Sequence, residues 1–579
     1  MKKITYKKNG FLILGINGWF EFGHDASAAL VEVTKESCKI LGALEEEKLS
    51  KLKCSYDTFP VLSIQALLER YSIEIHDIDY IVFGWNQPKM YDLKGTKFPF
   101  NNNKELLQAI FPHVKIKREI PIEFIDHHLA HAACSYRTST FNESLVTVID
   151  GQGETESTSV WIGKQNEIEK INQCDIETSF GYLYEATNSV LGFRNHESGK
   201  TMGLAPYGQP NYYDEISSSL EFHDGNITLS NNLIDIYNFS NRFEGSNFPG
   251  EKVIRTWEYY FRNKLKIKKS NSFTDSFYNF DESHKQLSSS VQKMLEDKVI
   301  EYIKYYSLKT GQSKICLSGG VALNCILNGK LLKEDFVEDL FINPASNDAG
   351  VALGAALELS HQLGYESRPN RKGNFSPFLG TEFSNDEIIE SLNNMNIKYQ
   401  LFEDASDFIA DAYSNDTTIA LFQGQNEWGP RALGNRSIIT SPKKFETLDY
   451  INQHIKKRET GRPLGPSILV EDADLLLKKP KMLGQYMNVG YSYEGEKNLF
   501  PAVIHVDHTF RPEFVDSSFN ETYYHQLSSI KKKVGNSVVI NTSFNLDTPI
   551  IYHIEDAINY FVNSNLDLLI FNNEIVLNK

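Results

Sequence analysis

The stretch 144-SLVTVIDGQGE-154 starts with an apolar, β-branched run that predicts a buried strand, and it ends in a polar turn with two glycines. A second strand is expected at 157–163, with a polar third strand after it. The start of the chain repeats this triplet, with strands expected at 11–17, 26–33 and 38–46. Helical segments follow both triplets, so the pattern predicts an α/β protein with two related lobes.

Each lobe is expected to contain further strands and helices in a similar order. The additional strands are expected at 79–85, 119–126, 313–320 and 339–344. Helices are expected at 59–71, 127–136, 180–192, 285–309, 321–332 and 348–359. Strands and helices therefore alternate in both halves of this region.

The chain is expected to form more than one domain, because 579 residues exceed the size at which a single core keeps growing. Residues 360–385 are polar and rich in turn formers, which places the boundary between 1–365 and 366–579. Residues 208–285 are polar and rich in Asn and Ser, and we interpret them as an insertion or lid that shapes an acceptor pocket. Strands of the second α/β domain are expected at 417–424, 436–442, 501–506 and 537–544.

Composition limits the functional classes. The net charge of −16 disfavours a protein that coats nucleic acid or an anionic membrane. The six cysteines include no C-x-x-C pair, which favours buried free thiols in a reducing compartment. We find neither a signal peptide nor a run of about 20 apolar residues that would span a bilayer, so a cytoplasmic protein is expected.

Three of the 15 histidines lie close together in 124-FIDHHLAHAACSY-136. On the expected helix, residues four apart share a face, which places His127 beside His131 and turns His128 about 100° away. A histidine pair at this spacing is a frequent metal-ligand arrangement. The alternative is that the pair lies on the surface or is satisfied in the core.

Two carboxylates are available to complete such a metal site. Asp150 and Asp348 each follow an expected strand, and side chains at such strand ends converge on a ligand crevice in open α/β sheets. Two histidines with one or two aspartates suit Fe(II), and Mn(II) or Zn(II) also fit this ligand set.

Glycine-rich turns follow three of the expected strands. Gly319 and Gly320 in 317-LSGGVALN-324 let backbone N–H groups approach an anion, and the helix N-terminus adds positive potential. Residues 347-NDAGVALG-354 and 150-DGQGE-154 repeat this arrangement, although a simple tight turn is the alternative for each. Three such turns in one domain resemble the nucleotide cleft of the actin-like ATPases, whereas P-loop and dinucleotide-binding motifs are absent from the sequence.

Two further motifs carry candidate site residues. In 23-GHDASAAL-30, His24 and Asp25 stand at a turn, where His24 acts either as a general base or only as a hydrogen-bond partner of Asp25. In 196-HESGKTMGLAPYG-208, Lys200 lies among small residues, and a structural loop is the alternative.

The C-terminal region concentrates cations despite the acidic total. Arg431 is enclosed by Gly, Pro, Ala and Leu in 425-QNEWGPRALGNRS-437, which fits a solvated surface charge poorly, whereas Lys457 in 455-IKKRETGRP-463 fits it well. Arginines with nearby hydroxyls suit phosphate or carboxylate groups. The other candidates are Arg436, Lys456, Arg458, Arg462 and Arg511, with Ser467, His505, Ser543 and Asn545 in comparable loop or strand-end positions.

Together these segments resemble the O-carbamoyltransferases of the nodulation-protein type, a family that includes aminoglycoside and cephem antibiotic carbamoyltransferases. The resemblance rests on an ordered set of motifs, among them FGHDASAAL, DHHLAHAACSY, VIDGQGE, GKTMGLAPYG, LSGGVALNCILNGKLL, NDAGVALGAA, QNEWGPRALGNRSI, KKRETGRP and NTSFN. They run from residue 15 to residue 545, which is nearly the whole chain.

The resemblance implies an actin-like (ASKHA) two-lobed N-terminal domain and a YrdC-like α/β C-terminal domain. It implies that the C-terminal domain makes carbamoyl-adenylate from carbamoyl phosphate and ATP with Mg²⁺. The iron-bearing N-terminal domain then transfers the carbamoyl group to a hydroxyl of a small molecule or glycoside and releases AMP. No nucleic-acid or membrane partner is expected, the protein is expected to be a monomer or homodimer, and the identity of the acceptor is not readable.

The family's site residues fall on matching positions of this sequence. The implied metal ligands are His127, His131, Asp150 and Asp348, in agreement with the spacing argument. The implied catalytic residues are His24, Lys53, Arg431, Lys456, Arg462 and Arg511. The implied nucleotide or substrate contacts are Asp25, Gly151, Gly153, Lys200, Gly319, Gly320, Asn324, Gly350, Ser467, His505, Ser543 and Asn545. Two departures lie near the adenylate pocket, since His508 replaces a family glycine and the loop 545–549 is one residue shorter.

Three other functions remain as alternatives. Related proteins that carbamoylate a protein cysteine carry an acylphosphatase module and paired C-x-x-C zinc modules, which this sequence lacks. Transfer to tRNA is disfavoured by the net charge. A nucleotide-dependent interaction protein that has lost activity is disfavoured by the intact candidate residues, although a fold alone does not prove function.

Overall fold

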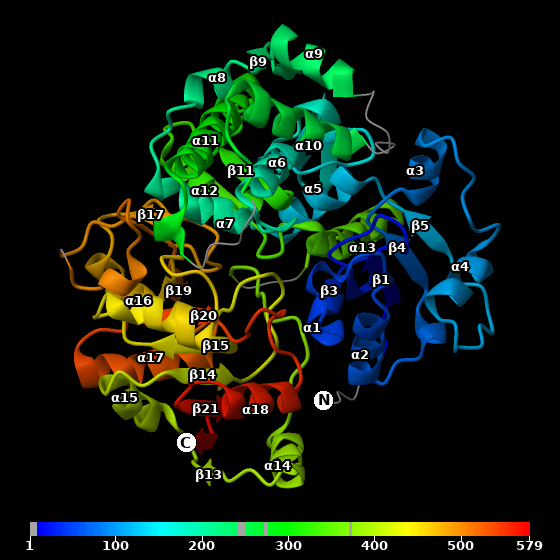
Figure 1. Ribbon diagram of the computed structural model, residues 1–579. Coiled ribbons are helices and arrows are strands. Elements are labelled where there is room, and N and C mark those ends of the chain that lie inside the picture. Colours follow the sequence, from blue (N-terminus) through cyan, green and yellow to red (C-terminus); the bar gives the residue numbers. More distant parts are fainter. Residues whose placement is uncertain (1–7, 241–248, 271–275, 370–372, 497) are drawn as a thin grey trace.

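The computed structural model describes residues 8–240, 249–270, 276–369, 373–496 and 498–579. Three large sheets organise this part of the chain, two of five strands in the N-terminal part and one of eight strands in the C-terminal part (Figure 1). No helix in these described ranges is both long and apolar enough to cross a bilayer.

The first lobe is built on a mixed five-stranded sheet. Its strands β1, β2 and β3 form the antiparallel triplet predicted at the start of the chain, and β4 and β5 continue from β1 in parallel. The strand order is β3-β2-β1-β4-β5. The strands are β1 (Phe11–Asn17), β2 (Ser27–Val33), β3 (Cys38–Glu45), β4 (Tyr80–Phe83) and β5 (Ile122–Phe124), and the helices include α1 (Glu46–Ser50), α2 (Val61–Tyr71), α3 (Gln87–Leu93) and α4 (Asn103–Ile110).

The second lobe repeats this topology. Its strand order, β12-β11-β6-β7-β8, matches that of the first sheet when β6 is placed on β1. The strands are β6 (Glu143–Ile149), β7 (Glu156–Lys164), β8 (Glu167–Asp175), β11 (Lys314–Ser318) and β12 (Asp339–Ile342). Two lobes with one repeated five-stranded topology form the actin-like arrangement, so the predicted fold class is confirmed.

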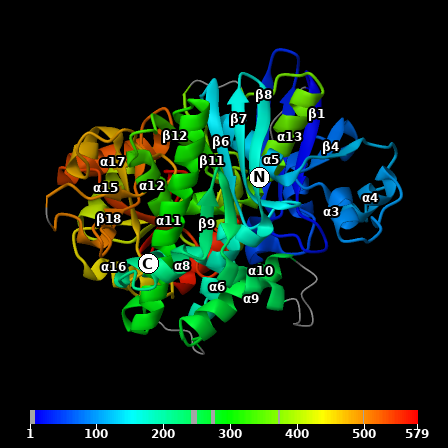
Figure 2. The same cartoon turned by 90° about the horizontal axis from the view of Figure 1, so that it is seen from above.

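Two helices fill the space between the lobes, α5 (His127–Thr138) and α13 (Val351–Gln362), which pack against each other (Figure 2). Small residues allow this close approach. A Cβ on Gly354 of α13 would lie 1.9 Å from the carbonyl oxygen of Ala130 on α5. A Cβ on Gly15 of β1 would lie 1.9 Å from the carbonyl oxygen of Ala352 on α13. The interface between the lobes therefore depends on glycines at these contacts.

The C-terminal domain contains an eight-stranded mixed sheet with the order β13-β22-β21-β14-β15-β20-β16-β19. Its strands are β13 (Gln400–Leu401), β14 (Ile419–Phe422), β15 (Arg436–Thr440), β16 (Gly465–Leu469), β19 (Glu513–Val515), β20 (Val539–Ser543), β21 (Leu568–Phe571) and β22 (Ile575–Asn578). Its helices are α14 (Asn385–Asn394), α15 (Ser406–Ser414), α16 (Glu446–Tyr450), α17 (Glu521–Val534) and α18 (Ile554–Asn563). The strand predicted at 501–506 is wrong, because Pro501–Val503 is a short 3-10 helix that begins at a proline, which suits a first helical position.

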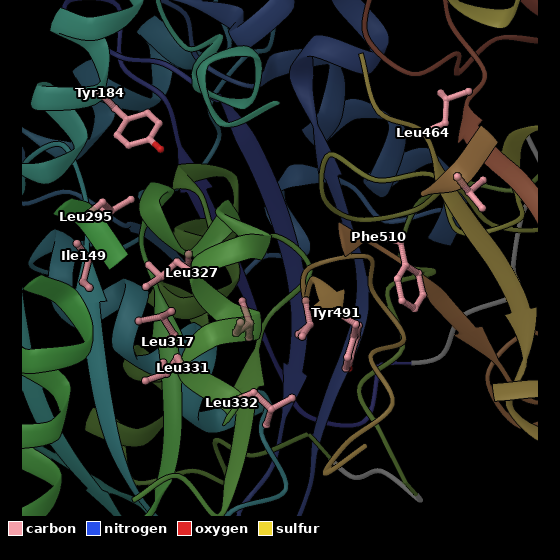
Figure 3. Packing of buried hydrophobic residues seen from close by; sticks show 14 of the residues in the cluster. Ile149, Tyr184, Leu295, Leu317, Leu327, Leu331, Leu332, Leu464, Tyr491 and Phe510 are labelled. Atoms are coloured by element: carbon pink, nitrogen blue, oxygen red, sulfur yellow. The ribbon is translucent and has the colours of Figure 1, made fainter. Parts of the chain in front are cut away.

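The apolar core is continuous from the second lobe into the C-terminal domain (Figure 3). Leu331 and Leu332 of α12 (Cys325–Lys333) belong to the same buried cluster as Tyr491 and Phe510. A Cβ on Gly329 would lie 1.8 Å from the carbonyl oxygen of Gly490, so backbone meets backbone here. This packing fixes the C-terminal domain against the second lobe.

The region 208–285 is partly core, which its polar composition did not predict. Trp257 and Phe261 are buried in the second-lobe cluster, where α10 packs on α6. Residues 241–248 and 271–275 of this region lie outside the described residues. The helices of the second lobe are α6 (Phe180–Leu191), α7 (Ser198–Leu204), α8 (Tyr213–Ser217), α9 (Asn231–Ser240), α10 (Pro249–Tyr259) and α11 (Glu282–Thr310), and β9 (Leu220–His223) pairs with β10 (Asn226–Leu229).

Candidate functional site

Four buried side chains converge between the lobes as a candidate metal site. His127 and His131 lie one turn apart on α5, Asp150 follows β6, and Asp348 precedes α13. His127 Nε2 lies 3.2 Å from Asp150 Oδ2, and His131 Nε2 lies 3.5 Å from an oxygen of each aspartate. One ligand atom from each residue lies within 4.8 Å of the others. Two imidazoles and two carboxylates in this arrangement fit a divalent metal ion.

The outer atoms of both imidazoles have partners that fix their orientation. His127 Nδ1 is 3.1 Å from the carbonyl oxygen of Gly84, and His131 Nδ1 is 3.3 Å from Ser318 Oγ. The indole of Trp85 stacks on the His127 ring with 3.8 Å between the ring centroids. Such contacts leave Nε2 of each histidine directed at the aspartates, as metal-binding histidines require.

The pKa values of His127 and His128 are shifted in opposite directions. Burial opposes the charged form of His127, but the carboxylates of Asp348 and Asp150 outweigh it and raise its pKa well above the usual value. Burial lowers the pKa of His128 to about 3, and its Nδ1 lies 2.7 Å from Ser159 Oγ. His128 is therefore a neutral residue of the lobe core, separate from the site as its position on the helix predicts.

His24 stands at the edge of the metal-ligand cluster. Its Nε2 lies 3.7 Å from Asp348 Oδ2, and its Nδ1 lies 3.4 Å from Asp25 Oδ2. Burial opposes protonation, but Asp348 and Asp25 outweigh it and raise the pKa of His24 to about 9. The ring of His196 lies 4.6 Å from that of His24. The structure thus brings the predicted residues His24 and Asp25 to the cluster.

The predicted glycine turns shape the same edge of the sheet. Gly319 has a φ of +89°, and a Cβ there would lie 2.2 Å from the carbonyl oxygen of Ile149. The amide N–H of Gly320 donates to Asp150 Oδ1 at 2.8 Å. A Cβ on Gly350 would lie 2.0 Å from a backbone oxygen. These turns position Asp150 and Asp348, and a contact with a nucleotide stays a prediction.

Three other predicted contacts lie around these turns. Ser179 Oγ donates to the carbonyl oxygen of Gly151 at 2.6 Å. A Cβ on Gly153 would lie 2.7 Å from the ring of His128. Asn324 caps α12, and its amide nitrogen donates to Gln292 at 2.9 Å.

Five cationic side chains gather in the C-terminal domain as a second candidate site. Burial, followed by the charges of Arg511 and Arg462, lowers the pKa of Arg431 to about 9. Burial, followed by Arg458 and Arg462, lowers the pKa of Lys456 well below its usual value. Mutual repulsion among enclosed cations is unfavourable unless an anion shares the site. The cluster is therefore suited to a phosphate-rich ligand.

Lys456 joins two more predicted residues to this cluster. Its Nζ donates to the carbonyl oxygens of Ser543 and Asn545 at 2.5 and 2.6 Å, and it lies 3.2 Å from Ser543 Oγ. Asn545 Oδ1 also accepts a hydrogen bond from Lys456. The structure therefore brings the candidate residues Lys456, Ser543 and Asn545 together, and their contact with a nucleotide stays a prediction.

Other predicted residues have structural partners. Ser467 is fully buried on β16 and donates to Glu513 at 2.5 Å. His505 Nε2 lies 3.0 Å from the carbonyl oxygen of Gly203 in the second lobe. The structure places Ser467 inside the sheet and His505 at the domain interface.

The two remaining lysines form ion pairs between the domains. Lys53 is half-exposed, and its Nζ lies 3.3 Å from Asp547. Lys200 is largely buried, and its Nζ lies 2.9 Å from Glu197 and 2.8 Å from Glu459. The structure thus places Lys200 in an ion pair between the domains, and its contact with a substrate or nucleotide stays a prediction.

Glu154 was not among the predicted site residues, whereas Arg458 was a candidate as part of the cation-rich run 455–463. Both carboxylate oxygens of Glu154 accept from the His127 backbone N–H, at 3.0 and 3.1 Å, which fixes the start of α5. Arg458 Nε donates to Asn452 Oδ1 at 2.8 Å inside the cation cluster. Glu154 lies in the motif DGQGE, which drew attention to its neighbour Asp150 and was the available signal.

The chain is similar to known proteins over most of its length. The family models Carbamoyltransferase N-terminus and Carbamoyltransferase C-terminus match residues 89–357 and 410–578. Nodulation protein NolNO of Sinorhizobium fredii is 32% identical over 571 residues, which cover 96% of this chain and 79% of the relative. The chain belongs to the carbamoyltransferase family. The predicted family is thus confirmed, and this carbamoyltransferase is a transferase enzyme.

Other similar proteins cover less of the carbamoyltransferase chain. Nodulation protein NolO of Bradyrhizobium diazoefficiens is 34% identical, over 77% of this chain and 77% of the relative. The 3'-hydroxymethylcephem-O-carbamoyltransferase of Amycolatopsis lactamdurans is 30% identical, over 41% of this chain and 43% of the relative. Among solved structures, full-length HypF in its phosphate- and nucleotide-bound form is similar at 14% identity and a TM-score of 0.31, which is too low to bear on function.

Proposed function

We propose that this carbamoyltransferase uses ATP and carbamoyl phosphate to carbamoylate a hydroxyl of a small molecule or glycoside. Carbamoyl-adenylate forms at the cation cluster of the C-terminal domain. The carbamoyl group is then transferred beside the four-residue metal-ligand cluster of the N-terminal domain, and AMP leaves.

The cation cluster is the observation that carries this proposal. Burial and the charges of Arg511 and Arg462 lower the pKa of Arg431, and burial and the charge of Arg462 lower the pKa of Arg511. A bound polyanion would stabilise the charged forms of both residues in this enclosed site. A triphosphate offers several oxygens to these guanidinium groups. Lys456 lies beside them with two backbone carbonyl contacts, which hold its ammonium group in one position.

The proposed chemistry balances in three steps. Water splits carbamoyl phosphate into carbamate and inorganic phosphate. A carbamate oxygen then attacks the α-phosphorus of ATP, which forms carbamoyl-adenylate and expels pyrophosphate. The acceptor hydroxyl finally attacks the carbamoyl carbon, so that its C–O bond forms as the bond to AMP breaks. Enclosure protects the intermediate from hydrolysis.

The N-terminal residues have distinct roles in the transfer step. A divalent ion such as Fe²⁺, Mn²⁺ or Zn²⁺ held by His127, His131, Asp150 and Asp348 would supply Lewis-acid polarisation. Once positive charge neutralises Asp348, His24 loses the largest of the attractions that raise its pKa. The neutral imidazole then takes the proton of the acceptor hydroxyl.

The two sites make the proposal testable by separate substitutions. Protein incubated with ATP and carbamoyl phosphate, without acceptor, should release pyrophosphate. We expect Arg431→Ala to abolish this release, because the triphosphate loses a buried partner. We expect His127→Ala to retain pyrophosphate release while elemental analysis shows loss of bound metal.

Lys457→Ala is the matched control, because this lysine lies next to Lys456 in sequence but is exposed. It should leave both pyrophosphate release and metal content unchanged. Equal loss of pyrophosphate release in folded Arg431→Ala and His127→Ala proteins would contradict the division of labour between the domains.

A further inference from the structure

The loop 192–197 of the second lobe, which joins α6 to α7, brings His196 against His24 of the first lobe. The ring centroids of His196 and His24 are 4.6 Å apart, with 49° between the ring planes. The ring of Tyr56, also from the first lobe, lies 5.5 Å from that of His196. His196 therefore contacts, from the opposite lobe, the residue that takes the acceptor proton in the proposed transfer.

Hydrogen bonds fix the backbone of His24 but not its ring. The side-chain amide of Asn17 donates to the carbonyl oxygens of His24 and Asp25, at 3.0 and 2.9 Å. Within the described part of the chain, His24 Nδ1 has no hydrogen-bond partner. Its Nε2 lies 3.7 Å from Asp348 Oδ2, which exceeds a hydrogen-bond distance. Packing against a neighbouring ring holds an imidazole in its neutral form, in which a general base acts.

The backbone of His196 is itself held in one conformation. Its φ is +59°, which is uncommon for a residue with a side chain and persists only where the surrounding structure enforces it. Its N–H donates to both carboxylate oxygens of Glu185 on α6, at 3.1 Å each. Ser198 Oγ donates to the same carboxylate at 3.1 Å. Hydrogen bonds to a carboxylate are strong, so the second lobe presents the His196 ring in a fixed place.

The loop 192–197 also contacts the C-terminal domain. Arg194 Nη1 lies 3.5 Å from Asp547 Oδ2, and Lys53 Nζ of the first lobe lies 3.3 Å from Oδ1 of the same carboxylate. The Arg194 backbone N–H donates to Glu197 Oε2 at 3.0 Å. Each exposed ion pair contributes little alone. Together they place this loop where both lobes and the C-terminal domain meet.

We propose that His196 is a positioning residue of the transfer step: its ring packs on His24 and keeps the His24 imidazole directed at the metal-ligand cluster. In this role His196 acts through His24 and contacts neither the metal nor the acceptor. The inference rests on the proposed carbamoyl transfer and adds a residue of the second lobe to it. The motif HESGK thus contributes more than a structural loop.

Chemical modification reports on the His24 ring without catalytic turnover. Diethyl pyrocarbonate carbethoxylates accessible imidazoles, and mass spectrometry of the peptide that contains His24 gives the rate. In zinc-loaded protein at one fixed pH, His196→Ala should raise this rate at least about threefold, because a ring pair of this kind contributes a factor of about 2–10. His196→Phe keeps a ring and should restore a rate close to wild type. An unchanged rate in His196→Ala, or an equal rise in His196→Phe, would overturn the inference.

A double substitution tests whether Glu185 acts through His196. Glu185→Gln weakens the hydrogen bonds to the His196 N–H, so it should also raise the modification rate of His24, by less than His196→Ala does. The double variant should match His196→Ala alone, and additive effects would contradict the proposed contact. His223→Ala, at an exposed histidine of β9 in the same lobe, is the matched control and should leave the rate unchanged. Circular dichroism confirms that each variant is folded.

Pyrophosphate release separates this inference from the proposed function. With ATP and carbamoyl phosphate alone, His196→Ala should release pyrophosphate and retain metal as wild type does. With methanol as the acceptor, methyl carbamate formation, measured by NMR, should fall at least about tenfold in His196→Ala and recover in His196→Phe, because a general base contributes about 10²–10⁴-fold. Faster modification of His24 in a protein that never releases pyrophosphate would refute the proposed function alone. Undiminished methyl carbamate formation by His196→Ala would refute the positioning role alone.

Discussion

Glu513 on β19 has a fully buried carboxyl group whose ionisation is linked to stability. Its Oε2 accepts from Ser467 and Asn541, at 2.5 and 3.0 Å. Burial raises its pKa from 4.5 to about 8. A raised folded-state pKa means that the stability contributed by the protonated group is fully present below pH 4.5 and is lost as the pH rises to about 8.

Glu513→Gln should therefore flatten the pH dependence of stability. Glutamine keeps the neutral form at every pH, so the free energy of unfolding should rise at pH 8, by at most about 5 kcal/mol. Urea denaturation between pH 4.5 and 8 measures this difference. Glu521→Gln, at an exposed residue of α17, should change neither the free energy of unfolding at pH 8 nor its dependence on pH. A Glu513→Gln curve parallel to wild type across this window would refute the assignment.

The positions of single residues were predictable where they follow from local geometry. His127 and His131 lie together because the helical period sets their spacing, and Asp150 and Asp348 were found because strand ends converge. The sequence therefore predicted that these four side chains lie close together. The buried Oε1 of Gln152 has no hydrogen-bond partner among the described residues, and this was not accessible, because it depends on which groups the tertiary fold leaves without a partner.

The turn between β11 and α12 shows how an element depends on one glycine. Gly319 has a φ of +89°, and its missing side chain leaves room for the carbonyl oxygen of Ile149. We expect Gly319→Ala to lower the free energy of unfolding by at least about 2 kcal/mol. The positive φ strains the backbone of an alanine, and the new Cβ clashes with the carbonyl oxygen of Ile149. Chemical denaturation measures the loss.

Gly199→Ala is the control for that prediction. Gly199 lies in helix α7, and no atom lies within 4 Å of the position its Cβ would take. Alanine there should be neutral or stabilise by about 0.5–1 kcal/mol, because it reduces the entropy of the unfolded chain. Similar losses for Gly319→Ala and Gly199→Ala would show that the turn tolerates a side chain.

Helices and strands were predicted correctly where apolar residues recur at the spacing typical of the element. The strand triplets of both lobes were found because β-branched residues cluster between turns, as in FLILGIN and SLVTVID. The helices of 208–285 were missed because an amphipathic helix is polar on average. Helix α10 is such a case, since Trp257 is buried although most residues of PGEKVIRTWEY are polar.

Both lobes of the N-terminal domain form hydrogen bonds with the loops of the C-terminal domain that carry the cation cluster. Lys48 of the first lobe donates to the carbonyl oxygens of Glu427 and Gly429, at 2.5 and 3.2 Å, on the loop before Arg431. Tyr207 of the second lobe donates to the carbonyl oxygen of Gly461 at 2.8 Å, next to Arg462. The two proposed reaction sites are therefore parts of one packed unit, which suits transfer of an unstable intermediate between them.

The buried ion pair between Lys200 and Glu459 offers a direct test of this coupling between domains. Among the ion pairs of the described residues, Lys200→Met leaves Glu459 with its pair to Arg462, at 3.5 Å. Removal of one partner from a buried pair costs about 3–5 kcal/mol, so the free energy of unfolding should fall by that order. The loosened interface should also release more pyrophosphate per carbamoylated product, because activated carbamoyl groups are lost to water.

Lys51→Met provides the matched comparison, since Lys51 also pairs across the domains, with Asp556 at 2.8 Å, but is 54% exposed. An exposed pair contributes less than about 1 kcal/mol, so this variant should keep both wild-type stability and the wild-type ratio of pyrophosphate to product. Denaturation curves, and the ratio of pyrophosphate to carbamoylated product, should be measured for both variants under the same conditions. If Lys200→Met behaves like Lys51→Met in both measurements, the ion pair does not couple the domains, and the intermediate must be retained by other contacts.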